Sequence, residues 1–329
     1  MKSILAASIC AIALMGATAL AQQAAAPAAP QPFAAGTPLG VTAADGKVTP
    51  MSSNVKVYGA VVSAESCSYD PTRNLIIVPN RGAEQNQAPN DGFVSLLNHD
   101  GSVHTSRWIG VNRNGLTLNQ PFGSDVHNGK LYLADSDGGT ADGAPRKSVI
   151  RTFDLKTGAP AGDMPMADVA WLNDIAVAKD GTVYGSQTGA GGDAATWRIY
   201  KVTPDGKTSI FLQGAPLMQP NGVAVDGAGN IVVVNIGDAA VLTFSPAGKL
   251  VKTEQAAQPG NDGLVIMADG TKYVSSVRNG GVSKIRPNAP AELIATGIPS
   301  AASMCYDAGA NQLVIPMNPN NSLAFVKLQ

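Results

Sequence analysis

The sequence contains an internal repeat, which limits the folds that the chain can adopt. Three segments share one layout, in which a short apolar run, a turn containing Gly and a β-rich run follow one another: NDIAVAKDGTVYGSQTG from Asn173, NGVAVDGAGNIVVVN from Asn221 and DGLVIMADGTKYVSS from Asp262. Two such runs around a turn of the Asp-Gly type are typical of a β-hairpin. The recurrence of one hairpin pattern along the chain predicts a repeat architecture, in which neighbouring copies bury each other's apolar faces.

Weaker copies extend this repeat along most of the chain. They start at Glu65 (ESCSYDPTRNLIIVPN), Phe122 (FGSDVHNGKLYLADS) and Ala302 (ASMCYDAGANQLVIPM), which makes six copies. Most copies are followed by a further hairpin, and four short strands per repeat of about 40–50 residues are typical of a β-propeller blade. We therefore predict an all-β, six-bladed β-propeller, with segment 55–62 as the outer strand of the last blade. A β-sandwich is the alternative, and six in-phase copies disfavour it.

The first 21 residues are typical of a signal peptide. Lys2 is followed by an apolar stretch over 4–20, and Ala19-Leu20-Ala21 provides the small residues that a signal peptidase needs. A membrane anchor is the alternative, but the stretch is short and no basic residues follow it. The Ala- and Pro-rich segment 22–52 is expected to be a flexible linker. We therefore expect a periplasmic or secreted protein whose propeller domain spans 53–329.

Charge and motif content argue against several other functions. Lys plus Arg number 23 and Asp plus Glu 24, so the net charge of −1 provides no basic surface for nucleic acid. No second stretch approaches the roughly 18 apolar residues of a membrane span. The GxSxG motif of many serine hydrolases is absent from the sequence. The three histidines, His99, His104 and His127, are expected in exposed turns.

Two cysteines, Cys67 and Cys305, remain after the signal peptide. They fall near the starts of the inner strands of the first and sixth blades, which become neighbours when the ring closes. A disulfide between them is possible in an oxidising compartment. However, they lie two and three residues after their reference positions, Glu65 and Ala302, and side chains alternate in direction along a strand. We therefore favour two separate buried thiols.

The first residue of each copy is the main candidate for function. Inner strands of a propeller line its central channel, and their starts gather at one mouth: Glu65, Phe122, Asn173, Asn221, Asp262 and Ala302. Four of these six side chains carry oxygen ligands, and hard cations such as Ca²⁺ prefer carboxylate and amide oxygens. The pattern thus predicts a central metal site. Asn-Gly, Asp-Gly and Asn-Asp are also ordinary turn and strand-entry dipeptides, so a structural explanation stays open for each residue.

These residues resemble the metal-site pattern of the senescence marker protein (regucalcin)/gluconolactonase family and, more distantly, that of the paraoxonases. The resemblance is carried by Glu65 in SAESCSYD, Asn173-Asp174 in WLNDIAV, Asn221 in QPNGVAVD and Asp262 in GNDGLVIMADG. It implies a six-bladed propeller that binds Ca²⁺, or another divalent cation such as Mn²⁺ or Zn²⁺, and hydrolyses lactones or other esters. It also implies that Glu65, Asn221 and Asp262 are metal ligands, and that Asn173 is a further ligand or holds metal-bound water.

Two positions depart from the pattern of that family. Trp171 stands where regucalcin-like sugar lactonases have an Arg, two residues before Asn173, which suggests a more apolar acyl or ring group in the substrate. Phe122 stands where paraoxonase-like enzymes have a His, so a mechanism based on that His is not expected. Trp171 and Phe122 are instead expected to form apolar walls of a substrate pocket.

The sequence therefore favours a metal-dependent hydrolase of a small lactone or ester. The metal is expected to polarise the ester carbonyl, and Asp262 to accept a proton from the attacking water. Burial raises the pKa of an Asp, whereas a neighbouring cation lowers it. The alternative is a non-catalytic periplasmic binding or scaffold propeller with a structural metal. A third possibility is an isomerase or lyase that uses the same metal.

Overall fold

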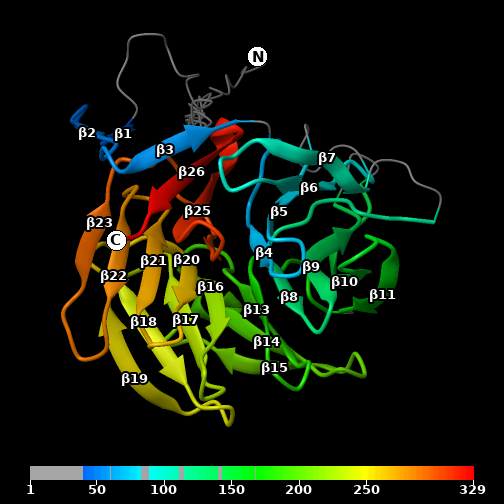
Figure 1. The fold of residues 1–329 in the computed structure, drawn as a ribbon. Coiled ribbons are helices and arrows are strands. Elements are labelled where there is room, and N and C mark those ends of the chain that lie inside the picture. The colour runs from blue at the N-terminus through cyan, green and yellow to red at the C-terminus, as the bar shows by residue number, and fades with distance from the viewer. Residues whose placement is uncertain (1–39, 60, 83–88, 111–114, 140–142, 167) are drawn as a thin grey trace, which may run out of the picture. The chain divides into compact units, whose positions relative to one another are not determined.

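The structure is a computed structural model that describes residues 40–329, except 60, 83–88, 111–114, 140–142 and 167. Its strands form six four-stranded antiparallel sheets, the blades of a six-bladed β-propeller, which confirms the predicted fold class (Figure 1). The signal peptide expected over 1–21 lies outside the described residues. Within the described residues, no helix has the length and apolar character needed to cross a membrane.

The first three blades follow one another along the chain, each with its strands in sequence order. Blade 1 comprises β4 (Ser68–Asp70), β5 (Leu75–Asn80), β6 (Phe93–Leu97) and β7 (Val103–Gly110). Blade 2 comprises β8 (Ser124–His127), β9 (Lys130–Asp137), β10 (Lys147–Asp154) and β11 (Pro160–Pro165). Blade 3 comprises β12 (Ile175–Val177), β13 (Val183–Gln187), the short helix η1 (Ala194–Thr196), β14 (Arg198–Val202) and β15 (Thr208–Gln213).

The last three blades have the same layout. Blade 4 comprises β16 (Pro220–Val225), β17 (Ile231–Asn235), β18 (Ala240–Phe244) and β19 (Leu250–Gln255). Blade 5 comprises β20 (Asn261–Ile266), β21 (Lys272–Ser276), β22 (Val282–Ile285) and β23 (Glu292–Ala295). Blade 6 comprises β24 (Cys305–Asp307), β25 (Gln312–Met317), the short helix η2 (Asn318–Asn320) and β26 (Ser322–Lys327). The first strand of each blade contacts the first strands of both neighbouring blades, so these six strands surround a central channel.

The described core consists of six apolar clusters, one between each pair of neighbouring blades. Ile77 belongs to the cluster between blades 1 and 2, whereas Ile76 and Val78 belong to the cluster between blades 1 and 6. Val233 and Val234 of blade 4 are divided between two interfaces in the same way. Because side chains alternate along a strand, a strand between two blades must be apolar on both faces. This explains continuous apolar runs such as IVVV in β17.

The hairpin turns lie where the sequence predicts them. Gly181 and Gly270 have φ angles of +87° and +84°, a conformation that side chains disfavour and glycine adopts readily. The side chain of Asp180 accepts the backbone N–H of Thr182 at 2.9 Å. These turns reverse the chain between the first and second strands of their blades.

The first described strand of the propeller and one histidine help to close the ring. β3 (Val55–Tyr58) pairs antiparallel with β26 and so becomes the outer strand of blade 6, as predicted (Figure 1). Between blades 1 and 6, Nδ1 of His99 lies 2.8 Å from Oδ1 of Asp307. The expectation of an exposed turn is therefore wrong for His99, which joins two blades.

Cys67 and Cys305 form a disulfide across a separation of 238 residues, so the preference for separate thiols is wrong. Their Cα atoms lie 5.4 Å apart, within the usual range. The alternation of side chains along a strand does not apply to Cys67. This residue precedes β4, which begins at Ser68, so regular strand geometry does not set the direction of its side chain. Its Sγ lies 3.2 Å from the carbonyl oxygen of Val314, the residue paired with Cys305.

The linker expected over 22–52 differs from the structure at its C-terminal end. There, β1 (Gly40–Thr42) and β2 (Val48–Pro50) form a hairpin whose turn contains Gly46, with a φ angle of +82°. The backbone N–H of Ser52 then donates to the carbonyl oxygen of Thr296 at 3.0 Å. The Asp45-Gly46 turn between two Val- and Thr-containing segments was the signal for this hairpin. Residues 22–39 lie outside the described residues.

We expect the double variant Cys67→Ser, Cys305→Ser to keep the propeller fold but to unfold more easily. Loss of a native long-range disulfide typically lowers the free energy of unfolding by about 2–5 kcal/mol. Urea titration followed by circular dichroism measures this change. Reducing agent should destabilise the wild type and leave the double variant unaffected. Free thiols at both Cys67 and Cys305 in unreduced, unfolded wild type, two in the mature protein and three if Cys10 is still present, would contradict the disulfide.

Candidate metal and substrate site

The residues predicted for the channel mouth lie at the starts of the inner strands. Asn221 and Asp262 are the second residues of β16 and β20, and Asn173 precedes β12 by two residues. The blade before holds the carbonyl oxygen of four such residues by a hydrogen bond: Ser66 Oγ to Phe122 (2.6 Å), Gly123 N–H to Asn173 (2.8 Å), Ser186 Oγ to Asn221, and Ser275 Oγ to Ala302 (2.7 Å). These repeated contacts place the candidate side chains at equivalent positions of successive blades.

The glycine after three of these residues serves close packing, and the sequence alone did not reveal this role. The three are Gly123, Gly222 and Gly263. A Cβ built on Gly222 would lie 2.2 Å from the carbonyl oxygen of Asp262, and one on Gly263 would lie 2.6 Å from the backbone nitrogen of Met304. None of the three has a left-handed φ angle. Asn221-Gly222 and Asp262-Gly263 are therefore not turn dipeptides but lie at strand entries, the other structural role open to such pairs.

Three buried oxygens at this mouth have no hydrogen-bond partner among the described residues. They are the Oδ1 atoms of Asn173, Asn221 and Asp262. The residues are 5%, 1% and 3% exposed, and buried polar atoms are normally paired. The amide nitrogens are engaged, since Asn173 Nδ2 donates to Thr188 Oγ1 at 3.3 Å and Asn221 Nδ2 donates to Asp262 Oδ2 at 3.2 Å. Three consecutive blades thus present acceptors that a cation would satisfy.

Glu65, the fourth predicted ligand, contacts two donors from its own blade and from blade 6. Its Oε2 accepts a hydrogen bond from Arg81 Nη1 at 3.3 Å and another from Asn318 Nδ2. Among the described residues, no hydrogen bond reaches Oε1. Burial raises the pKa of the Glu65 carboxyl above its ordinary value, and the Arg81 and Asn318 contacts oppose this rise. One oxygen of this carboxyl group is therefore available to a further partner.

Three carboxyl groups at the mouth lie close enough to influence each other's ionisation. Desolvation raises the pKa of Asp262 well above its ordinary value, and the charges of Glu65 and Asp174 raise it further. Desolvation also raises the pKa of Asp174 to about 7, although its Oδ2 accepts the backbone N–H of Val223 at 3.0 Å. A bound cation would favour the ionised forms of such groups. The clustering of these three carboxyl groups therefore favours the binding of a cation at the mouth.

A cavity of about 380 Å³ lies in the channel, and all six inner strands contribute to its lining. Asp125 and Asp174 are its acidic residues. Desolvation raises the pKa of Asp125 to about 6, although the backbone N–H of Val177 donates to this carboxyl group at 2.7 Å. Asp174 therefore borders both the cavity and the group of predicted ligands, a position that sequence reasoning did not assign.

Phe122 and Trp171, the residues predicted as apolar walls of a substrate pocket, contact each other, and an arginine lies against Phe122. The rings of Phe122 and Trp171 are 5.3 Å apart at an interplanar angle of 73°. The guanidinium carbon of Arg81 lies 4.6 Å from the centre of the Phe122 ring, a favourable cation–π contact. Arg81 thus connects the aromatic pair to Glu65. Sequence reasoning missed Arg81, whose one signal was its position directly after the strand that ends at Asn80.

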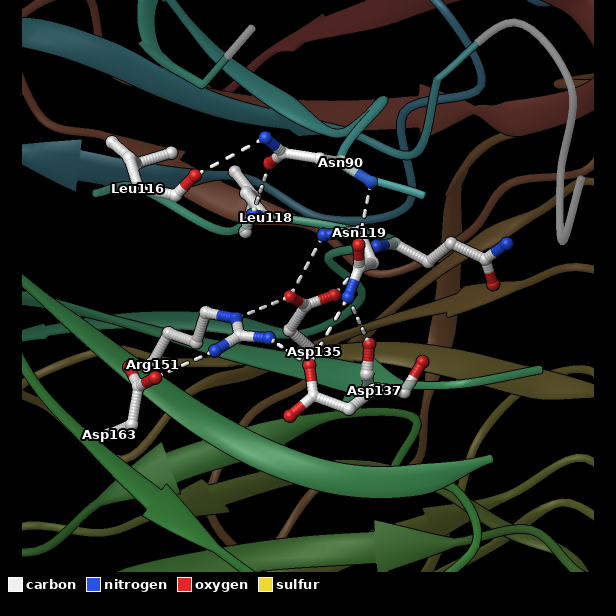
Figure 2. A network of polar contacts seen from close by, with 10 residues as sticks. Asn90, Leu116, Leu118, Asn119, Asp135, Asp137, Arg151 and Asp163 are labelled. Carbon is white, nitrogen blue, oxygen red and sulfur yellow. Dashed lines mark hydrogen bonds and ion pairs between the residues drawn. The ribbon is translucent and has the colours of Figure 1, made fainter. Parts of the chain in front are cut away.

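A polar network in blade 2 fixes the segment before Phe122 (Figure 2). The carboxyl group of Asp135 accepts the backbone N–H groups of Asn119 at 3.0 Å and Gln120 at 2.6 Å. Arg151, which is only 3% exposed, pairs with three carboxylates, those of Asp135, Asp137 and Asp163. Because Arg151 holds the Asp135 carboxyl group by a charge-assisted contact, the network fixes the backbone of Asn119 and Gln120, directly before Pro121 and Phe122.

The residues present suit one class of metal. Within the described residues, no group of three or more His, Cys, Asp or Glu side chains is arranged to hold an ion. The predicted set consists instead of two carboxylates and two amides, and its unpaired atoms are oxygens. Such ligands suit a hard cation such as Ca²⁺, whereas soft metals prefer thiolates and imidazoles. The donor chemistry therefore fits Ca²⁺ better than Zn²⁺.

Comparison with known proteins supports the fold. No family model matches the sequence, and no curated protein matches it significantly. A gluconolactonase from Xanthomonas campestris has a similar structure, with a TM-score of 0.56 and 16% identity over 93% of this chain and 99% of its own. A candidate gluconolactonase, solved as a structural genomics target, has a TM-score of 0.56 and 16% identity over 84% of this chain and 93% of its own.

A third similar structure has a different activity. It is a catalytically inactive variant of virginiamycin B lyase from Staphylococcus aureus with quinupristin, with a TM-score of 0.55 and 11% identity over 84% of this chain and 100% of its own. Identities this low show a shared fold and leave the activity of this chain to be argued from its site. The neighbours named as gluconolactonases nevertheless agree with the resemblance seen in the sequence.

We expect Gly222→Ala to destabilise the protein by about 1–3 kcal/mol, because its Cβ would press on the backbone of the next inner strand. Gly227→Ala is the matched control, since a Cβ there meets no atom within 4 Å and its φ angle is not left-handed. The control should change stability by less than about 0.5 kcal/mol. Urea unfolding of both variants measures the difference, and equal effects would argue against the close-packing role.

Proposed function

We propose that this protein is a metal-dependent hydrolase of lactones or related esters, with Ca²⁺ as the favoured ion. The observation that carries this proposal is the set of three unpaired buried oxygens, on Asn173, Asn221 and Asp262, at the mouth that also holds Glu65. Two structural neighbours named as gluconolactonases support the same class of reaction.

Glu65, Asn173, Asn221 and Asp262 would hold the ion. A bound divalent cation supplies a Lewis acid that polarises an ester carbonyl and stabilises the oxyanion formed on attack. The two carboxylates of this set balance the charge of a divalent ion, and the two amides add neutral oxygens. Burial of all four side chains limits competition from water.

Asp262 is the group best placed to accept a proton in this reaction. The oxygen of water adds to the acyl carbon while its proton passes to the Asp262 carboxylate. The bond between the acyl carbon and the alkoxy oxygen then breaks, and the proton is delivered to that oxygen. Asn221 Nδ2 fixes Oδ2 of Asp262, and Oδ1 has no partner among the described residues. A lactone would thus open to one hydroxy acid.

The main alternative is a non-catalytic binding or scaffold propeller in which the ion only joins blades. Ligands from blades 1, 3, 4 and 5 would suit that role as well. Trp171 favours the hydrolase, because its partly exposed ring, which packs on the buried Phe122, offers an apolar surface to a substrate and is not needed to hold an ion.

We also propose that the protein is exported to the periplasm or secreted. The signal-like segment over 1–21 supports this location. The Cys67–Cys305 disulfide supports it independently, because disulfides form and persist mainly in oxidising compartments.

Two isosteric substitutions should separate the roles of the two carboxylates. Glu65→Gln and Asp262→Asn should both weaken metal binding. Saturating Ca²⁺ should restore much of the hydrolysis by Glu65→Gln, whose proposed role is charge and coordination. Asp262→Asn should remain about 10²–10⁴-fold below wild type, the usual contribution of a proton acceptor. Initial rates on a panel of lactones and aryl esters, with added Ca²⁺, Mn²⁺ or Zn²⁺ and with chelator, provide the measurement.

The exposed Glu292→Gln is the control, because it makes the same chemical change far from the mouth on β23. Equal rescue of Glu65→Gln and Asp262→Asn would remove Asp262 from the proton-accepting role. If wild type hydrolyses nothing on the panel while the ion still raises its melting temperature, the scaffold alternative is correct.

A further inference from the structure

The mouth also carries buried donors without partners. They are Nε of Arg81, Nε2 of Gln120 and Nε1 of Trp171, none of which has a hydrogen-bond partner among the described residues. Arg81 is 9% exposed and Gln120 only 4%. A buried donor that has lost water and gained no acceptor is destabilising. Three such donors therefore indicate a ligand that brings acceptors of its own.

These donors gather on one side of the site, around the aromatic pair. Arg81 stacks on Phe122, Phe122 contacts Trp171, and Gln120 precedes Phe122 by two residues. The unpaired acceptors belong to blades 3, 4 and 5. The site is thus divided into an acceptor side that suits a cation and a donor side that suits an anion.

A second guanidinium makes the donor side more positive. Arg146 Nη2 donates to Gln120 Oε1 at 2.7 Å, which leaves Gln120 Nε2 as the free donor of that amide. Desolvation lowers the pKa of Arg146, and the nearby charge of Arg81 lowers it further. In the described part of the chain, Arg81 pairs with Glu65 and Arg146 has no ion pair. The charge of Asp135, which also pairs with Arg151, opposes this lowering of the Arg146 pKa.

We propose that the substrate carries a carboxylate of its own, in addition to the ester that is cleaved, and that Arg81, Arg146, Gln120 and Trp171 bind this carboxylate. The assignment of the cleaved bond rests on the proposed function. A carboxylate offers several lone pairs to guanidinium, amide and indole N–H groups at once. A hydroxyl or ether oxygen offers fewer lone pairs to these donors and no charge to the two guanidinium groups. The substrate class is accordingly a lactone or ester of a dicarboxylic acid, and Trp171 acts as a donor as well as a wall.

A matched pair of lactones tests this inference. The γ-lactones of D-glucarate and D-gluconate differ only in a carboxylate or a hydroxymethyl group at the far end of the chain. We expect wild type to prefer the glucarate lactone in kcat/KM by about 10–100-fold, as for a charge-assisted hydrogen bond in a buried site. Arg146→Met should remove most of this preference, mainly through a higher KM for the anionic lactone, with the neutral lactone little affected.

Arg278→Met is the matched control. It removes the same charge from an exposed arginine that donates to Gln219, and it should leave the preference unchanged. A wild type without preference for the anionic lactone, or an equal preference in wild type and Arg146→Met, would overturn the inference.

Calorimetry separates this inference from the proposed function. In the Asp262→Asn background, the dissociation constants of the two lactones can be measured without turnover. Tighter binding of the glucarate lactone that is lost with added Arg146→Met supports carboxylate recognition, even if wild type hydrolyses neither lactone and the hydrolase proposal fails. Hydrolysis of both lactones with no binding preference retains the proposed function and rejects carboxylate recognition. Absence of binding by both lactones also rejects it.

Discussion

Neighbouring inner strands approach each other closely around the channel, and the positions of the six blades follow from this approach. Gly222 and Gly263 have no side chain at the points where the next inner strand passes, and hydrogen bonds such as Ser275 Oγ to the Ala302 carbonyl join successive blades there. Beyond this ring, each blade packs apolar faces on both of its neighbours. No blade can therefore bury its own surface alone, and stability comes from completing the circle.

The same packing explains why the candidate polar side chains lie at the starts of the inner strands. Side chains that face neighbouring blades are mostly apolar, and several buried polar groups near the axis lie at the starts of the inner strands. There they are desolvated but not fully paired, as the Oδ1 atoms of Asn173 and Asn221 and the Nε2 atom of Gln120 show. Buried polar groups without partners are rare in folded proteins. Their separation into an acceptor side and a donor side gives the mouth a polarity that a ligand with both kinds of group would match.

The sequence predicted much of the fold because hairpin periodicity is local. It predicted the six blades and the closing role of β3, since apolar runs and turns such as Asp180-Gly181 recur in phase. It selected Glu65, Asn173, Asn221 and Asp262 by their shared position in the repeat. It failed where the direction of a side chain depends on irregular backbone, as at Cys67 before β4. It also failed where candidate binding residues lie in loops, as at Arg81, Gln120 and Arg146. These residues lie outside the repeat pattern, and only tertiary structure brings them to the mouth.

The Cys67–Cys305 disulfide also determines how the chain would respond to tension applied at its two ends. The S–S bond closes a covalent loop across this separation of 238 residues. Tension between the two ends is carried by the S–S bond and does not reach the residues inside the loop. Only the segments before Cys67 and after Cys305 can then be drawn out, which includes β3, β25 and β26. At about 3.3–3.6 Å per extended residue, the disulfide prevents about 800 Å of the chain from being extended. Oxidised and reduced protein would therefore differ in extensibility far more than in shape.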